Sequence, residues 1–160
     1  MSNNIRSLKR AKEKQQAKEG VIKVTLAQII RSLGPQPEIP GAIDFLMSQA
    51  LPIRTSFQLN KIAKAAIIEF QEYQAAKKTL CERLANKDKD GKAIILEDGK
   101  PSTKGEYDIP ADKLVELEKE HADLIAMEVE IPGQQIKVGD LGDARIAPAH
   151  LMALEWLVID

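Results

Sequence analysis

The sequence predicts a mainly α-helical protein with some strand (α+β), built on a long antiparallel helical hairpin. Residues 54–85 form one amphipathic stretch without Gly or Pro, and residues 110–127 form a second helical stretch after a group of turn signals. Short alternating runs at the two ends of the chain indicate strands. About thirty helical residues span roughly 45–50 Å, which exceeds the diameter of a small domain. The first stretch is therefore expected to be the spine of the fold.

Short helices are expected before the spine. Val21–Val24 has the composition of a strand, and Thr25 is a good N-cap for a helix that runs to Leu33 and ends at Gly34-Pro35. A second short helix is expected from Pro40 to Leu51. Both helices should pack across the first half of the spine, where four further residues widen its apolar face: Ala63, Ala65, Ile67 and Ile68.

The apolar face of the spine is defined by a spacing of three and four residues. Its members are Leu59, Ile62, Ala66, Phe70, Tyr73, Leu80 and Leu84, and Lys77 interrupts the series. Turn signals at residues 86–91 and 97–100 flank a short apolar run, which predicts a β-hairpin or ordered loop over 92–109 at the tip. The returning helix, 110–127, should face the spine through Leu114, Leu117, His121, Leu124 and Ile125.

The remaining elements should form a small base of strand and helix. Residues 128–132 and 135–138 have strand character on either side of Pro132-Gly133, and Ala147-Pro148 opens a final apolar helix that reaches Leu157. The expected organisation is a basic arm, residues 1–20, followed by a single domain, 21–160, with a tip insertion at about 86–109. A chain of 160 residues is the size of one domain.

Charge is distributed unevenly along the chain. Residues 1–24 contain seven Lys or Arg against two Glu, whereas the rest contains sixteen Lys or Arg against twenty-two Asp or Glu. A basic arm on an acidic body is typical of a segment that contacts a partner. Nucleic acid is a less favoured partner, because no recognition motif accompanies these charges and the aromatic content is 4%.

One stretch resembles a calcium-binding loop. Oxygen-bearing side chains alternate at Asn86, Asp88 and Asp90, and Gly91 and Glu97 occupy the positions of the turn glycine and the bidentate carboxylate. Asn in the first position, Ala93 in the eighth and Pro101 after the loop depart from that pattern. The tip-turn interpretation is preferred, and no metal or cofactor is expected.

Catalytic motifs are weak in this sequence. Cys81 and His121 could meet across the two long helices, but a lone Cys is usually a small buried hydrophobe and a lone His a boundary residue. The chain contains no GxGxxG, GxxxxGK[ST], HExxH, CxxC or GxSxG pattern. A single cysteine favours a reducing compartment, and no apolar run approaches the length of a membrane span. The expectation is a non-enzymatic, soluble protein.

Taken together, several segments resemble small, mostly uncharacterised proteins of tailed bacteriophages and prophages. The resemblance covers about residues 21–158, and it rests on residues 24–29, Leu51-Pro-Ile-Arg54, the Asp-Gly turns of the tip, the acidic returning helix, residues 128–131, 136–141 and 146–157. That group has no agreed catalytic residues. The resemblance implies a virion component, located in the host cytoplasm during assembly.

The leading hypothesis is a phage structural or assembly protein that acts through protein–protein contacts in a head, neck or tail. Its partners would be other phage structural proteins or copies of itself. The expected contact residues are basic: Arg6, Lys9, Arg10, Lys12 and Lys14 in the arm, and Lys87, Lys89 and Lys92 at the tip. The alternative is a host-interaction or anti-defence protein that binds a host factor or sequesters a small signalling molecule.

Overall fold

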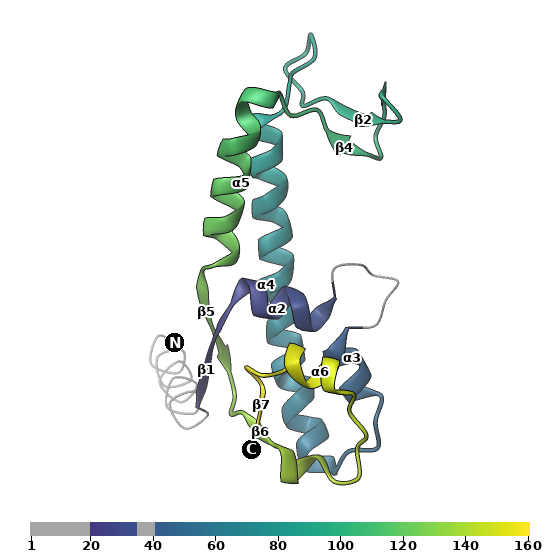
Figure 1. Cartoon of the computed structure of the whole chain (residues 1–160), viewed down its shortest axis with the longest axis vertical. Coiled ribbons are helices and arrows are strands. Elements are labelled where there is room, and N and C mark those ends of the chain that lie inside the picture. The colour runs from purple at the N-terminus through teal and green to yellow at the C-terminus, as the bar shows by residue number, and fades with distance from the viewer. Residues whose placement is uncertain (1–19, 35–40) are drawn as a thin grey trace, which may run out of the picture. The chain divides into compact units, whose positions relative to one another are not determined.

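The protein combines helices and short strands around one long helix (Figure 1). The computed structural model describes residues 20–34 and 41–160. In chain order the elements are β1 Val21–Thr25, α2 Leu26–Leu33, α3 Ala42–Met47, α4 Ile53–Leu84, β2 Ile95–Glu97, β3 Lys100–Pro101, β4 Glu106–Tyr107, α5 Ala111–Ile125, β5 Glu128–Pro132, β6 Ile136–Lys137, the 3-10 helix η1 Val138–Leu141, α6 Pro148–Ala153 and β7 Val158–Ile159. The mixed architecture and the long helix confirm the coarse prediction.

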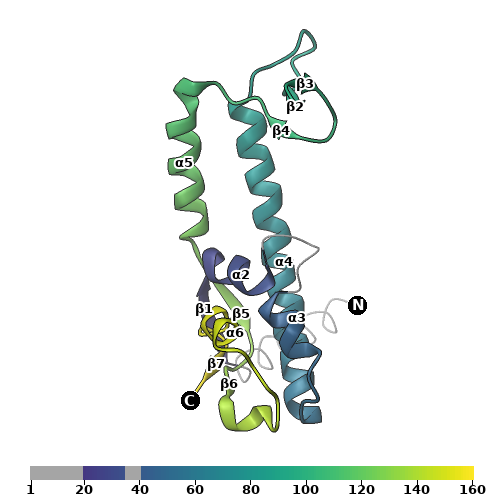
Figure 2. The ribbon, with the colours of Figure 1, turned by 45° about the vertical axis from the view of Figure 1, so that its right-hand side comes forward.

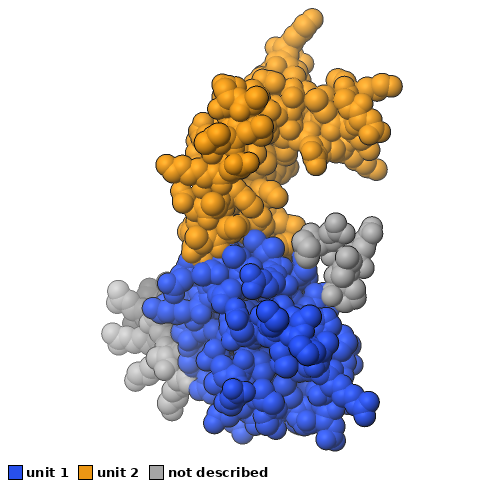
Figure 3. Space-filling model, in the orientation of Figure 1, with its two compact units in different colours: residues 1–69, 128–160 blue, residues 70–127 orange. Residues whose placement is uncertain are grey.

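The chain divides into two compact units, which Figure 3 shows in different colours. Unit 1 comprises residues 1–69 and 128–160, and unit 2 comprises residues 70–127. The division falls inside α4, so this helix contributes its first part to unit 1 and its last part to unit 2. The expectation of a single domain over 21–160 stays a prediction.

The described residues of unit 1 form two small sheets. Strands β1 and β5 pair antiparallel, with Ile22 opposite Ile131 and Val24 opposite Val129. Ile22 and Val24 are buried whereas Val21 and Lys23 are exposed, as the alternation of a half-buried strand requires. Strands β6 and β7 pair in parallel. Strand β7 was not predicted, because a strand of two residues is too short to produce an alternating pattern in the sequence.

Among the short helices of unit 1, α2 begins at its predicted N-cap, whereas α3 and α6 end earlier than the sequence predicts. Thr25 caps α2 through a capping box, in which its hydroxyl accepts from the backbone N–H of Gln28 and the Gln28 side chain accepts from the backbone N–H of Thr25. Helix α3 ends at Met47 rather than near Leu51. Helix α6 ends at Ala153, and Trp156 is nevertheless buried in the turn that follows.

The apolar face of α4 lies largely where the sequence predicts it. Six of its seven predicted members are buried and Phe70 is half-buried, the buried ones being Leu59, Ile62 and Ala66 in unit 1 and Tyr73, Leu80 and Leu84 in unit 2. The predicted widening of this face is wrong for two residues, because Ile67 and Ile68 are exposed. Ile68 points about 180° around the helix from Leu59, and Ile67 points about 140° around it from Ile62.

In unit 2, helix α5 lies beside the last part of α4 in both ribbon views (Figures 1 and 2). The tip carries a small antiparallel sheet in the order β3-β2-β4, which agrees with the strand character predicted for 92–109. Within the described part of the chain, no side chain of α5 is buried. The prediction that Leu114 packs inward is therefore wrong, and Leu117, His121, Leu124 and Ile125 are only half-buried.

Candidate protein-binding surface

The predicted contact residues divide between the tip and the arm. Lys87, Lys89 and Lys92 are all exposed, as a contact role requires, although the Lys87 ammonium donates a hydrogen bond to the backbone oxygen of Glu82. The predicted arm residues, Arg6, Lys9, Arg10, Lys12 and Lys14, lie outside the residues that the structure describes.

The four side chains of the calcium-loop pattern do not converge on one point. The Asp88 carboxylate accepts from the backbone N–H groups of Asp90 and Lys92, which makes a tight turn. The Asn86 amide donates to Asp108 and the Glu97 carboxylate accepts from Ser102. Among residues 20–34 and 41–160, no group of three or more His, Cys, Asp and Glu side chains could hold a metal ion. The tip is thus a hydrogen-bonded turn.

His121 pairs with a tyrosine. Its Nε2 lies 2.9 Å from the Tyr73 hydroxyl oxygen, so that one of the two atoms donates to the other. Burial lowers the pKa of His121, and the nearby positive charge of Lys77 lowers it further. Cys81 is half-buried and free. The Tyr73–His121 contact joins α5 to the last part of α4 within unit 2.

A second polar contact joins the same two helices nearer the tip. The Arg83 guanidinium donates to Glu120 at 2.6 Å and lies 3.7 Å from Glu116. The hydrogen bond from Arg83 lowers the pKa of Glu120 and the same bond raises the pKa of Arg83. Burial, followed by the charge of Glu82, raises the pKa of Tyr107. The ion pairs of Arg83 with Glu116 and Glu120 are exposed at the surface, where an ion pair contributes little to stability.

The most prominent exposed apolar surface lies on the first half of α4. Ile53, Phe57 and Ile68 are 90%, 65% and 54% exposed, and Lys61 and Lys64 lie between them at helical spacing. We call these five residues the α4 stripe. Large apolar side chains gathered on one exposed face of a helix are typical of a protein-binding site.

Sequence reasoning missed this surface. The residues face away from Leu59 and Ile62, since Phe57 precedes Leu59 by two positions and therefore points about 200° around the helix from it. A helical wheel of residues 53–68 would have shown a second apolar stripe opposite the buried one. The signal was present in the spacing of Ile53, Phe57 and Ile68.

The α4 stripe borders a hollow. The Lys61 ammonium lies 5.6 Å from the centre of the Phe57 ring, a cation–π geometry that orders both side chains. Beside them a hollow of about 200 Å³ is lined by Phe57, Gln58, Lys61, Ile62 and residues 132–134. The backbone at Gly133 approaches Ile62 closely, and only glycine fits there without strain. Its φ is +140°, and a Cβ at this position would lie 2.9 Å from Cγ1 of Ile62.

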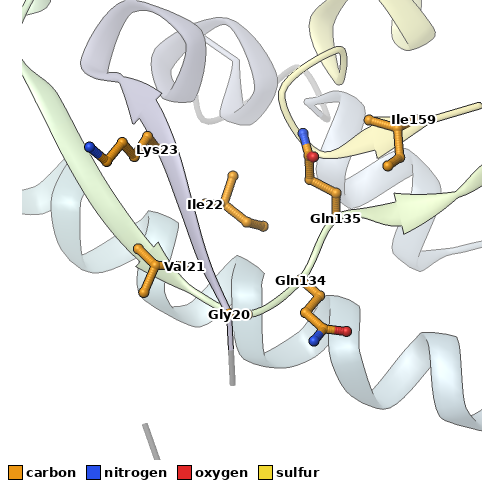
Figure 4. Close-up of a pocket in the computed structure, with 8 residues that line it drawn as sticks. Gly20, Val21, Ile22, Lys23, Gln134, Gln135 and Ile159 are labelled. Carbon is orange, nitrogen blue, oxygen red and sulfur yellow. The ribbon is translucent and has the colours of Figure 1, made fainter. Parts of the chain in front are cut away.

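A larger hollow lies at the start of β1 (Figure 4). It measures about 520 Å³ and is lined by Gly20–Lys23, Gly133–Gln135 and Ile159. In Figure 4 the Ile22 side chain lies on the side of β1 that faces Gln135 and Ile159. The Gln135 amide donates to the backbone oxygen of Trp156 at 2.9 Å, which ties this hollow to the buried residues 156–158. Its size falls in the range of small-molecule sites.

Among the helices of the described ranges, none is both long enough and apolar enough to cross a bilayer. We compared the chain with protein-family models, with curated proteins and with solved structures, and none of the three comparisons gives a match. A functional conclusion must therefore be built from the surfaces described above.

Proposed function

We propose that the protein is a non-enzymatic structural or assembly component of a phage particle, which acts through protein–protein contacts. The observation that carries the contact role is the α4 stripe, because Ile53 and Phe57 leave large apolar surfaces in water on a long, regular helix. The phage context is supported by the resemblance of residues 21–158 to small phage proteins. In this proposal α5 and the last part of α4 act as a rigid antiparallel helical hairpin, and the basic arm and the tip lysines supply further contacts.

The contacts between α4 and α5 support the hairpin as a body. Tyr73, the earlier residue of α4, contacts His121. Arg83, the later residue of α4, contacts Glu116 and Glu120, which precede His121 in α5. Such an order is the one that antiparallel helices produce. Both contacts are directional, which restricts sliding of one helix along the other.

The test is to look for the chain in particles. Virions and assembly intermediates would be purified from the phage or induced prophage that encodes it, and its peptides sought by mass spectrometry. We expect the wild-type chain in one of these fractions and the Phe57→Asp variant in neither. Gln74→Asp is the matched control, because it places the same charge at an exposed position of α4 that lies off the face of the α4 stripe. Absence of the wild-type chain from every fraction would refute the proposal.

The larger hollow favours a second candidate function, the sequestration of a small molecule. Its volume of about 520 Å³ is in the range of small-molecule sites, and the Gln135 side chain belongs to its lining. Native mass spectrometry of the untagged protein at two salt concentrations distinguishes the two functions. A stoichiometric extra mass that survives purification would replace the contact proposal by this one.

A further inference from the structure

We infer that the α4 stripe of one copy binds helix α5 of a second copy of the chain. This inference rests on the proposed contact function and names the partner of the stripe. The inference rests on two exposed apolar helix faces of opposite charge in the same chain: the α4 stripe, which carries lysines, and the exposed face of α5, which carries a carboxylate.

Helix α5 has too little of its own surface covered. Within the described residues none of its fifteen residues is buried, and Val115 is 74% exposed. Helices of this length derive most of their stability in water from packing of an apolar face. A partner that covers α5 would supply the missing packing.

The exposed residues of α5 form a stripe of their own. Ala111, Leu114, Val115, Glu118 and Ala122 recur at helical spacing and are all exposed. We call these residues the α5 stripe. Apolar residues lie at its two ends and one carboxylate, that of Glu118, lies near its middle. The α4 stripe has the same order with the opposite charge, since Lys61 and Lys64 lie between its apolar ends.

Charge favours this pairing over a symmetric one. Residues 53–68 of α4 carry Arg54, Lys61 and Lys64 and no Asp or Glu, whereas the α5 stripe carries the carboxylate of Glu118 and no Lys or Arg. Two α4 stripes facing each other would bring like charges together, and so would two α5 stripes. A contact between α4 and α5 places opposite charges across the interface, which increases the association rate and selects the register.

The two stripes also match in length. At 1.5 Å per residue, the α4 stripe extends over about 22 Å and the α5 stripe over about 17 Å. The contact joins different surfaces of the two copies. It is therefore heterologous and forms rings or open chains of subunits unless the geometry closes it as a pair, and such contacts build repetitive particles.

The experiment is sedimentation velocity on the full-length chain over a wide concentration range. We expect the wild-type protein to associate and the variants Phe57→Glu and Val115→Glu each to weaken association at least about tenfold. Both side chains are exposed, so both variants should keep the wild-type circular dichroism. Gln74→Glu is the control, because it adds the same charge at an exposed position of α4 that lies off the face of the α4 stripe.

Two combinations test the pairing itself. An equimolar mixture of Phe57→Glu and Val115→Glu should form a one-to-one complex, because one variant retains an intact α4 stripe and the other an intact α5 stripe. On one chain, Lys64→Glu with Glu118→Lys should associate more tightly than either single variant. If the α4 stripe instead binds another α4 stripe, or the α5 stripe another α5 stripe, neither combination would restore association. That result would overturn the inference.

A wild-type chain that stays monomeric at every concentration would also overturn the inference. That result leaves the proposed function intact if the chain is found in particles. Conversely, a chain that associates through these stripes but is absent from particles would refute the function and keep the inference.

Discussion

Two isoleucines on α4 allow one side-chain deletion to be compared in two environments. Ile62 is 1% exposed in the core of unit 1, and Ile68 is 54% exposed on the same helix. Ile62→Ala removes three buried carbon atoms, which is worth about 2.4 kcal/mol of transfer free energy at roughly 0.8 kcal/mol per carbon. The cavity left behind raises the total destabilisation to about 2–5 kcal/mol. Ile68→Ala loses less burial and gains helix propensity, so we expect a change within about 0.5 kcal/mol.

The assay is urea unfolding monitored by the fluorescence of Trp156. This is the only tryptophan of the chain, it is buried, and it belongs to unit 1, as both isoleucines do. The midpoint should fall markedly for Ile62→Ala and hardly move for Ile68→Ala, with the slope unchanged in both. Equal losses at a concentration where the chain is monomeric would show that the assigned faces of α4 are wrong. A loss for Ile68→Ala that grows with protein concentration would instead show that this side chain is covered in an assembly.

Three further predictions concern the backbone, a helix cap and a titration. Gly133→Ala should destabilise unit 1 by roughly 1–3 kcal/mol, because φ is +140° and the new Cβ would press on Ile62, whereas Gly139→Ala, with open space around it, should change the urea midpoint little. Thr25→Ala should cost about 0.5–2 kcal/mol through the lost N-cap of α2, and Thr25→Ser should restore most of it; equal midpoints for the two variants would contradict the capping box. The ring of His121 should titrate below its ordinary pKa of 6.5, since burial disfavours the charged form. The unfolded chain then takes up the proton first as the pH falls through 6.5, so this group should lower the stability on acidification; an NMR titration midpoint above 6.5 would contradict this assignment.

Periodicity predicted the phase of the long helix because the phase depends only on spacing. Leu59, Ile62 and Tyr73 are buried as their positions require, and Thr25 caps α2 because local side-chain chemistry decides a helix start. The two-residue strand β7 could not be predicted in this way. It forms because Ile136 and Val158, far apart in the sequence, lie opposite each other.

The errors share a physical cause. An apolar pattern shows which side chains of a helix would be buried against a partner, but it does not show whether the same chain supplies that partner. Leu114 has the right spacing for an inward face and is nevertheless exposed. Phe57 and Ile53 were missed because α4 has two apolar faces and the prediction assigned only one of them. The candidate binding surface is therefore identified by the exposed fractions of its side chains in the structure, whereas the buried face of α4 follows from the spacing of apolar residues in the sequence.

The division of the chain also bears on the order in which it folds during synthesis. Unit 2 is one continuous stretch, residues 70–127. Strand β1 leaves the ribosome early but pairs with β5, where Val21 lies opposite Pro132, more than a hundred residues later. Contacts of such separation form slowly because a long loop must close first. Ile22 and Val24 of β1 therefore gain their packing against β5 only after residues 128–132 have been translated.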